Sequence, residues 1–168
     1  MQEELLEIVD KNGKSLGIAP RSSIHGDPSL LHKVVHVLVF DSSGRLLLQK
    51  RSMSKDVAPG KWDTSVGGHV APGEDTPVAA HREMEEELGV DGGEITFLYS
   101  YIYSNTHESE LVSTHSCIHD GPFRFNADEI DEIRFWRLEE IIENIGTGIF
   151  SGHFEAELAT YMAFSTRT

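Results

Sequence analysis

The stretch that decides the fold runs from residue 68 to residue 90: Gly68-His69-Val70-Ala71-Pro72-Gly73-Glu74, seven further residues, and Arg82-Glu83-Met84-Glu85-Glu86-Glu87-Leu88-Gly89-Val90. Within it, Thr76 and Pro77 predict the start of a helix, with Thr76 as the N-cap and Pro77 at the first helical position. Gly89 suits the left-handed position that follows a helix. The apolar face of this helix, which can pack on a sheet, consists of Ala80, Met84 and Leu88.

Three carboxylates share another face of the same predicted helix. Glu83, Glu86 and Glu87 stand at positions i, i+3 and i+4, so their side chains are neighbours. Like charges at this spacing repel one another and destabilise an isolated helix. A hard divalent cation such as Mg²⁺ prefers oxygen ligands and offsets that repulsion. The pattern therefore indicates a metal site, although a solvated acidic face is the commoner meaning of such a charge run taken alone.

Strands and helices are predicted on both sides of this stretch, within one domain that covers residues 1–168. Asn12-Gly13 is a two-residue turn signal and predicts an N-terminal hairpin over about residues 5–20. Loops that could set specificity are expected at residues 20–31, 52–61 and 104–110. Further strands are expected at residues 34–40, 45–51, 62–70, 94–104, 111–118 and 132–138, and further helices at 139–145 and 153–164.

Composition narrows the class of partner. The formal net charge is −14, which disfavours nucleic acid polymers but leaves room for a small phosphorylated substrate held through a cation. No apolar run approaches the roughly 20 residues that span a bilayer, so no membrane association is expected. Cys117 is the only cysteine, and the N-terminus is acidic. Together these features favour the cytoplasm.

The stretch 68–90 resembles the Nudix family, because it matches the signature G-x5-E-x7-R-E-U-x-E-E-x-G-U, in which U is an aliphatic residue. The resemblance implies an α+β fold of the α/β/α sandwich type, with a mixed β-sheet between helices. It also implies a Mg²⁺- or Mn²⁺-dependent hydrolase that cleaves the diphosphate linkage of a nucleoside diphosphate derivative or a related organic diphosphate. A homodimer is common for such folds.

The same resemblance assigns roles to residues of the stretch. The metal ligands would be the carbonyl oxygen of Gly68 and the carboxylates of Glu83, Glu86 and Glu87. Either Glu83 or Glu86 would be the general base, and we favour Glu86. A further pair, Arg82 and Glu74, would support the box, with Arg82 orienting the helix carboxylates through Glu74.

A narrower resemblance connects the chain to the type I isopentenyl-diphosphate isomerases, which share the Nudix fold. It is carried by Leu31-His32, residues 46–51, Ser54-Lys55, residues 59–62 and Gly68-His69. It implies that Arg51 and Lys55 hold the substrate diphosphate. It also implies a second metal site, for a metal such as Zn²⁺, formed by His25, His32 and His69, with His115 as a candidate fourth ligand.

Basic residues concentrate just before the Nudix-like stretch. Arg51, Lys55 and Lys61 fall within eleven positions of a chain that has only 14 basic residues. Solubilising surface charge is the usual meaning of such residues. Their position here indicates that all three could bind the substrate phosphates.

Two departures separate this chain from the isomerases. Gly67 stands where they carry a catalytic cysteine, and glycine supplies neither acid nor base. Their later E-x-E pair aligns with Ser113 and His115, which would remove a second catalytic carboxylate. We therefore expect a hydrolase, with isopentenyl-diphosphate isomerisation and a non-catalytic module that binds a phosphorylated ligand as the alternatives.

Overall fold

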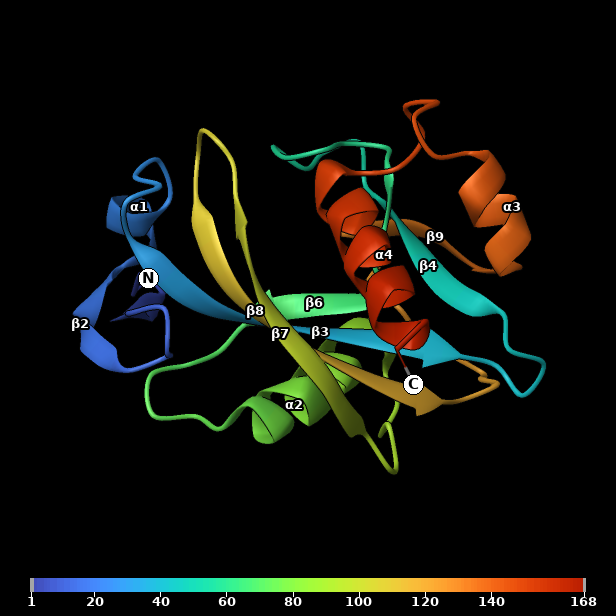
Figure 1. Ribbon diagram of the computed structural model, residues 1–168, viewed down its shortest axis with the longest axis horizontal. Coiled ribbons are helices and arrows are strands. Elements are labelled where there is room, and N and C mark those ends of the chain that lie inside the picture. Colours follow the sequence, from blue (N-terminus) through green and yellow to red (C-terminus); the bar gives the residue numbers. More distant parts are fainter. Residues whose placement is uncertain (1, 168) are drawn as a thin grey trace.

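A computed structural model describes residues 2–167, and strands and helices alternate along them as the sequence predicts (Figure 1). The strands are β1 (Leu5–Val9), β2 (Ser15–Pro20), β3 (Leu31–Phe40), β4 (Leu46–Arg51), β5 (Trp62–Asp63), β6 (Val66–His69), β7 (Thr96–Ser104), β8 (Ser109–Ile118) and β9 (Ile130–Trp136). The helices are α1 (Arg21–Ile24), α2 (Thr76–Leu88), α3 (Leu138–Glu143) and α4 (Gly152–Ser165). Within the described part of the chain, none of them is long and apolar enough to cross a membrane.

Strand β3 is the centre of a mixed sheet. It pairs antiparallel with β1, β4 and β6, and parallel with β8 along ten consecutive residue pairs. Strand β8 then pairs antiparallel with β7, and β4 with β9 and β5. Because β3 lies between β6 and β8, side chains from these three strands that share a face are brought into one row.

Helices cover both faces of this sheet, which confirms the α/β/α arrangement (Figure 1). Val37 and Val39 of β3 belong to the apolar cluster that packs against α2. The intervening Leu38 belongs to the cluster under α3 and α4, together with Phe154. Side chains alternate along a strand, so the even-numbered residues of β3 face α4 and the odd-numbered ones face α2.

Helix α2 begins and ends close to where the sequence predicts. Its N-cap is Asp75, one residue before the expected Thr76, because the extended backbone ends at Asp75 with ψ 148° and Thr76 is already helical. Pro77 lies in the first turn as expected. Gly89 takes the left-handed conformation with φ 66°, and its N–H donates to the carbonyl of Glu85 at 3.0 Å.

Substitution of Gly89 tests how the end of α2 is fixed. A Cβ at this position would lie 2.8 Å from the carbonyl oxygen of Arg124, whereas a Cβ at Gly44, which also has positive φ, would meet nothing within 4 Å. Gly44→Ala should therefore cost only the left-handed strain, about 1–2 kcal/mol, and Gly89→Ala should cost more. Thermal unfolding of both variants checks this, and equal losses of Tm would contradict it.

Candidate metal centre and active-site cleft

A cleft of about 390 Å³ joins the two groups of residues that the sequence singles out. Its walls come from β3, β6 and α2, from the segment around β4 and β5, and from the starts of β8 and α4. Glu83, Glu86 and Glu87 of α2 line this one space together with His25 and His69, whereas the buried His32 is not among the lining residues. The acidic lining residues include Glu83, Glu86, Glu87, Glu108 and Glu110.

Glycine at position 68 lets α2 approach β6. Gly68 pairs with Val35 of β3, on the face covered by α2. A Cβ on Gly68 would overlap the carboxyl group of Glu83. The absence of a side chain therefore allows the Glu83 carboxylate to lie against the backbone of β6, beside the carbonyl expected to be a ligand.

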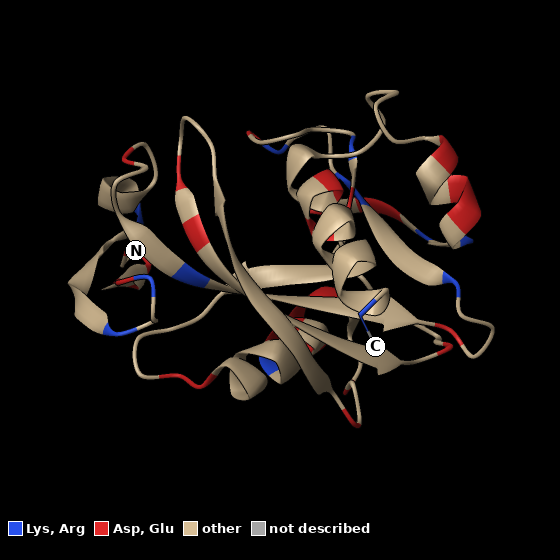
Figure 2. Ribbon diagram, viewed as in Figure 1, with Lys and Arg blue, Asp and Glu red and all other residues tan. Residues whose placement is uncertain are grey.

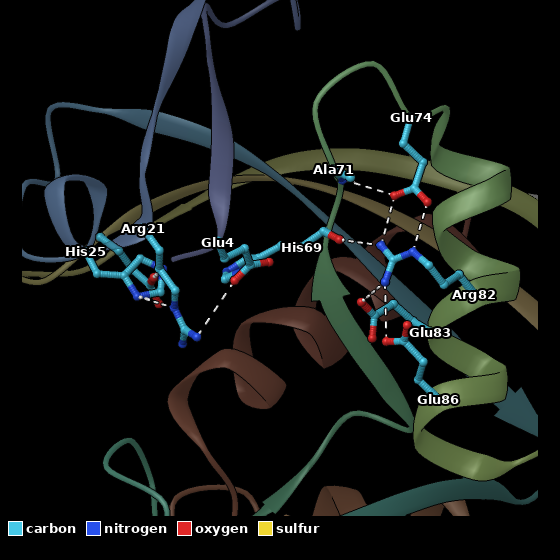
Figure 3. Close-up of polar contacts among 10 residues, drawn as sticks. Glu4, Arg21, His25, His69, Ala71, Glu74, Arg82, Glu83 and Glu86 are labelled. Atoms are coloured by element: carbon cyan, nitrogen blue, oxygen red, sulfur yellow. Dashed lines mark hydrogen bonds and ion pairs between the residues drawn. The ribbon is translucent and has the colours of Figure 1, made fainter. Parts of the chain in front are cut away.

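Arg82 is the centre of an ion-pair network that fixes the carboxylates of α2 (Figure 3). Its guanidinium donates twice to Glu74, both at 2.9 Å, and once to the carbonyl of His69 at 3.0 Å. Its Nη1 donates to Glu83 at 2.8 Å and to Glu86 at 3.3 Å. The bonds from Arg82 lower the pKa of Glu74, so that carboxylate stays charged and holds Arg82 in place.

Glu87 is the most enclosed carboxylate of the helix. It accepts hydrogen bonds from the side-chain amide of Gln49 at 3.0 Å and from the N–H of Gly67 at 3.1 Å. Burial raises the pKa of Glu87 to about 8 and the pKa of Glu83 to about 7. Burial is the largest cause of both shifts, and the hydrogen bonds from Arg82 to Glu83 and from Gln49 to Glu87 only partly offset it.

The predicted histidine cluster comes together in the structure. The ring centroids of His25, His32 and His69 lie 5.2–5.4 Å apart, and each offers a ligand atom within 4.8 Å of the others. Both ring nitrogens of His32 are buried without a hydrogen-bond partner. Burial lowers the pKa of His32 to about 4, so the ring is neutral and has a free lone pair. These properties fit a transition-metal site.

Two carboxylates that the sequence analysis missed complete this cluster. Glu108 and Glu110, at the start of β8, form a second set of potential ligands with His32. Oε2 of Glu110 is buried without a hydrogen-bond partner. Nε2 of His25 lies 3.2 Å from Glu108 without hydrogen-bond geometry. Within residues 2–167 these two overlapping sets converge, whereas the three carboxylates of α2 form no such set.

The expected equivalence of Ser113 and His115 with the isomerase E-x-E pair is therefore wrong. In the β3–β8 register these residues pair with Val35 and Val37, in the row that faces α2. His115 is buried, contacts the ring of Phe97 at 5.6 Å and does not line the cleft, so it is not a fourth ligand. The sequence signal for the acidic pair was the E-x-E spacing of Glu108-Ser109-Glu110. The assignment of residues 104–110 to a loop concealed it.

His153, at the start of α4, balances the charge of this acidic pair. Its Nε2 lies 3.2 Å from Glu110 and 3.4 Å from Glu108. Burial opposes protonation of His153, but the two carboxylates outweigh it and raise its pKa to about 10. Burial also raises the pKa of Glu108, but the bond from His153 and the other charges outweigh it and lower that pKa. No sequence motif surrounds His153, so the sequence analysis missed it.

Two of the three predicted phosphate-binding residues line the cleft. Arg51 donates from Nε to the carbonyl of Val57 at 2.8 Å, and its Nη1 lies 3.4 Å from Asp63. Lys55 lies 3.8 Å from Glu129, in a weak ion pair that a substrate could displace. Lys61 is not among the residues that line the cleft, because its ammonium group donates to the carbonyl of Gly148.

The response to Mg²⁺ at two pH values tests the α2 carboxylates as ligands. Folding raises the pKa of Glu83 from 4.5 to about 7 and of Glu87 from 4.5 to about 8. Protons are thus held by the folded chain and released by the unfolded one, so metal-free stability falls as pH rises through this window. Mg²⁺ must displace these protons. Its gain in Tm should be larger at about pH 8.5 than at about pH 6, and equal gains would count against these ligands.

Comparison with known proteins agrees with this geometry. A family model described as NUDIX domain matches residues 30–155. An isopentenyl-diphosphate Delta-isomerase of Streptomyces avermitilis is 35% identical over 156 residues, covering 89% of this chain and 79% of its own. An uncharacterized Nudix hydrolase of Pseudomonas aeruginosa is 35% identical over 140 residues, covering 83% of this chain and 82% of its own.

Solved structures share the fold over most of the chain. A crystal structure of a Deinococcus radiodurans protein superposes with a TM-score of 0.80 at 26% identity, covering 94% of this chain and 98% of that one. A MutT protein from Methanosarcina mazei superposes with a TM-score of 0.62 at 24% identity, covering 70% of this chain and 83% of that one. With the fold, the box and the family match in agreement, the chain belongs to the Nudix family.

Proposed function

We propose that this chain is a metal-dependent hydrolase that cleaves a diphosphate linkage in a nucleoside diphosphate derivative or a related small organic diphosphate. The observation that carries the proposal is the single cleft that joins the carboxylates of α2 to Arg51 and Lys55. Carboxylates suit Mg²⁺ or Mn²⁺, and basic side chains suit phosphate oxygens. The chain as a whole has net charge −14, with acidic residues on several of its elements (Figure 2), which favours a small substrate over a nucleic acid polymer.

Glu86 is our choice for the general base. Bound Mg²⁺ or Mn²⁺ would offset the charge of the phosphates and lower the pKa of an attacking water. Glu87 is occupied by Gln49 and Gly67, and Glu83 lies under Arg82 against β6. The side chain of Glu86 is 57% exposed, so its carboxylate can reach a water in the cleft.

A second cation, such as Zn²⁺, suits the other end of the cleft. Neutral imidazoles and carboxylates are the ligands that such metals accept. His25, His32 and His69 supply the nitrogens, and Glu108 and Glu110 supply the oxygens. This centre would help to hold the substrate diphosphate by its charge.

Isopentenyl-diphosphate isomerisation is the second candidate activity. It is favoured by Glu108 and Glu110, which supply the carboxylate pair, and by the similarity to the Streptomyces avermitilis isomerase. It is disfavoured by Gly67, because proton transfer at carbon needs an acid or base at that position. Conversion of isopentenyl diphosphate to dimethylallyl diphosphate at enzyme-like rates would establish the isomerase and displace the hydrolase.

A substrate screen tests the proposal. Nucleoside diphosphate sugars, dinucleoside polyphosphates, nucleotide cofactors and prenyl diphosphates are each incubated with Mg²⁺, Mn²⁺ or EDTA, and the products are separated by chromatography. The proposal expects metal-dependent cleavage between two phosphorus atoms in at least one class. Binding of these compounds without any turnover would overturn it in favour of a non-catalytic module.

A matched pair of variants on α2 tests the role of Glu86. Glu86→Gln and Glu85→Gln make the same chemical change on neighbouring exposed residues, but only Glu86 lines the cleft. If Glu86 is the base, kcat should fall by roughly a hundredfold or more in Glu86→Gln. It should stay unchanged in Glu85→Gln. Equal kcat in the two variants would remove Glu86 from the mechanism and leave Glu83 as the candidate.

A further inference from the structure

His36 is held from one side by a buried carboxylate. Its Nδ1 lies 2.7 Å from Oε1 of Glu157, a residue of α4 with no exposed surface. Glu157 also accepts hydrogen bonds from the hydroxyl groups of Thr114 at 2.9 Å and Tyr99 at 2.5 Å. An ionised carboxylate only accepts hydrogen bonds. Nδ1 of His36 is therefore the donor, and the ring is fixed in one orientation.

The other ring nitrogen of His36 is free. His36 lines the cleft and keeps 6% of its surface exposed. Within residues 2–167, no hydrogen bond satisfies its Nε2. A contact between β3 and α4 needs only Nδ1 of His36, so it does not explain why Nε2 faces the cleft.

The opening above His36 exists because residue 67 is glycine. Gly67 pairs with His36 across β3 and β6. A Cβ at position 67 would lie 3.1 Å from Cδ2 of His36 and 3.4 Å from Nε2. Any larger side chain would cover this edge of the ring. The φ of Gly67 lies outside the left-handed region, so the backbone itself does not require glycine.

We propose, on the basis of the proposed function, that His36 contacts the substrate, with Nε2 donating a hydrogen bond past Gly67 to a phosphate oxygen of the bound diphosphate. Glu157 is then a positioning residue that orients the ring from behind. The N–H of Gly67 donates to Glu87, so His36 reaches the cleft beside the carboxylates of α2. A diphosphate that faces the carboxylates of α2 on one side needs hydrogen-bond donors on its other side. His36, which lines the cleft, supplies such a donor.

The electrostatics agree with a donor at Nε2. Burial lowers the pKa of His36, but the hydrogen bond and charge of Glu157 outweigh it, so the pKa is raised overall. Burial raises the pKa of Glu157, but His36, Tyr99 and Thr114 outweigh it and lower that pKa. Both directions favour the imidazolium–carboxylate form of the pair, in which both ring nitrogens of His36 carry protons.

Two variants of His36 separate substrate contact from structural support. The amide nitrogen of His36→Asn takes the place of Nδ1 and can still donate to Glu157, but nothing replaces Nε2. The amide of His36→Gln takes the place of Nε2 and leaves Glu157 without that donor. If His36 has only a structural role, His36→Asn should be more stable than His36→Gln and should also bind a diphosphate more tightly. Our proposal predicts opposite orders: Asn is more stable, and Gln binds better.

The binding probe is methylenediphosphonate with Mg²⁺, followed by calorimetry, with Tm measured in parallel. Relative to the native chain, Kd should rise about tenfold to a hundredfold in His36→Asn and less in His36→Gln. A His36→Asn protein with unchanged Kd overturns the proposal. If the native chain does not bind the probe, this inference fails, whereas the proposed function depends on turnover in the substrate screen. If it binds the probe but hydrolyses no substrate of the screen, only the proposed function fails.

Gly67→Ala supplies an independent check through a double-mutant cycle. The new methyl group should weaken binding of methylenediphosphonate in the native background by covering Nε2 of His36. In the His36→Asn background there is no Nε2 to cover, so the further loss should be small. Equal losses in both backgrounds would show that the methyl group acts without His36, against the proposal.

Discussion

The site can form only if the negative charge enclosed in the cleft is offset. Glu83, Glu87, Glu108 and Glu110 line the same cleft, and burial penalises the ionised forms of Glu83, Glu87 and Glu108. Three local devices offset this charge. Arg82 contacts Glu83 and Glu86, and His153 contacts Glu108 and Glu110. Burial raises the pKa of Glu83 and Glu87 and so favours protons on these two carboxylates. Cations bound in the cleft would replace the protons, which couples metal binding to this arrangement.

Two consecutive glycines of β6 leave space on opposite faces of the sheet. Gly68 gives the carboxylate of Glu83 room on the face toward α2, and Gly67 leaves the ring of His36 open on the face toward α4. Consecutive glycines are needed because neighbouring residues of a strand point to opposite faces. The cysteine of the isomerases at the position of Gly67 would meet His36 in this chain. The pair Gly67 and His36 is therefore consistent with a chemistry other than isomerisation.

Most of the fold could be predicted from local patterns. Hairpin, strand and helix signals each depend on neighbouring residues, and the Nudix-like stretch fixes the position of α2 and its end at Gly89. Glu108 and Glu110 were missed because their role depends on the register of β8 against β3, which pairs Glu110 with His32. His36 was missed because its partner Glu157 lies 121 residues later in the chain. The prediction for Lys61 was wrong because its partner, the carbonyl of Gly148, lies 87 residues later in the chain.

The cleft is proposed to hold cations at two separate centres, one on α2 and one formed by His25, His32, His69, Glu108 and Glu110. Anomalous diffraction from crystals grown with Mn²⁺, and from crystals grown with Zn²⁺, tests it most directly. We expect a Mn²⁺ peak bounded by Glu83, Glu86 and Glu87, and a Zn²⁺ peak bounded by the three histidines. Peaks at neither position, or peaks that leave the histidine cluster empty with both metals, would contradict it.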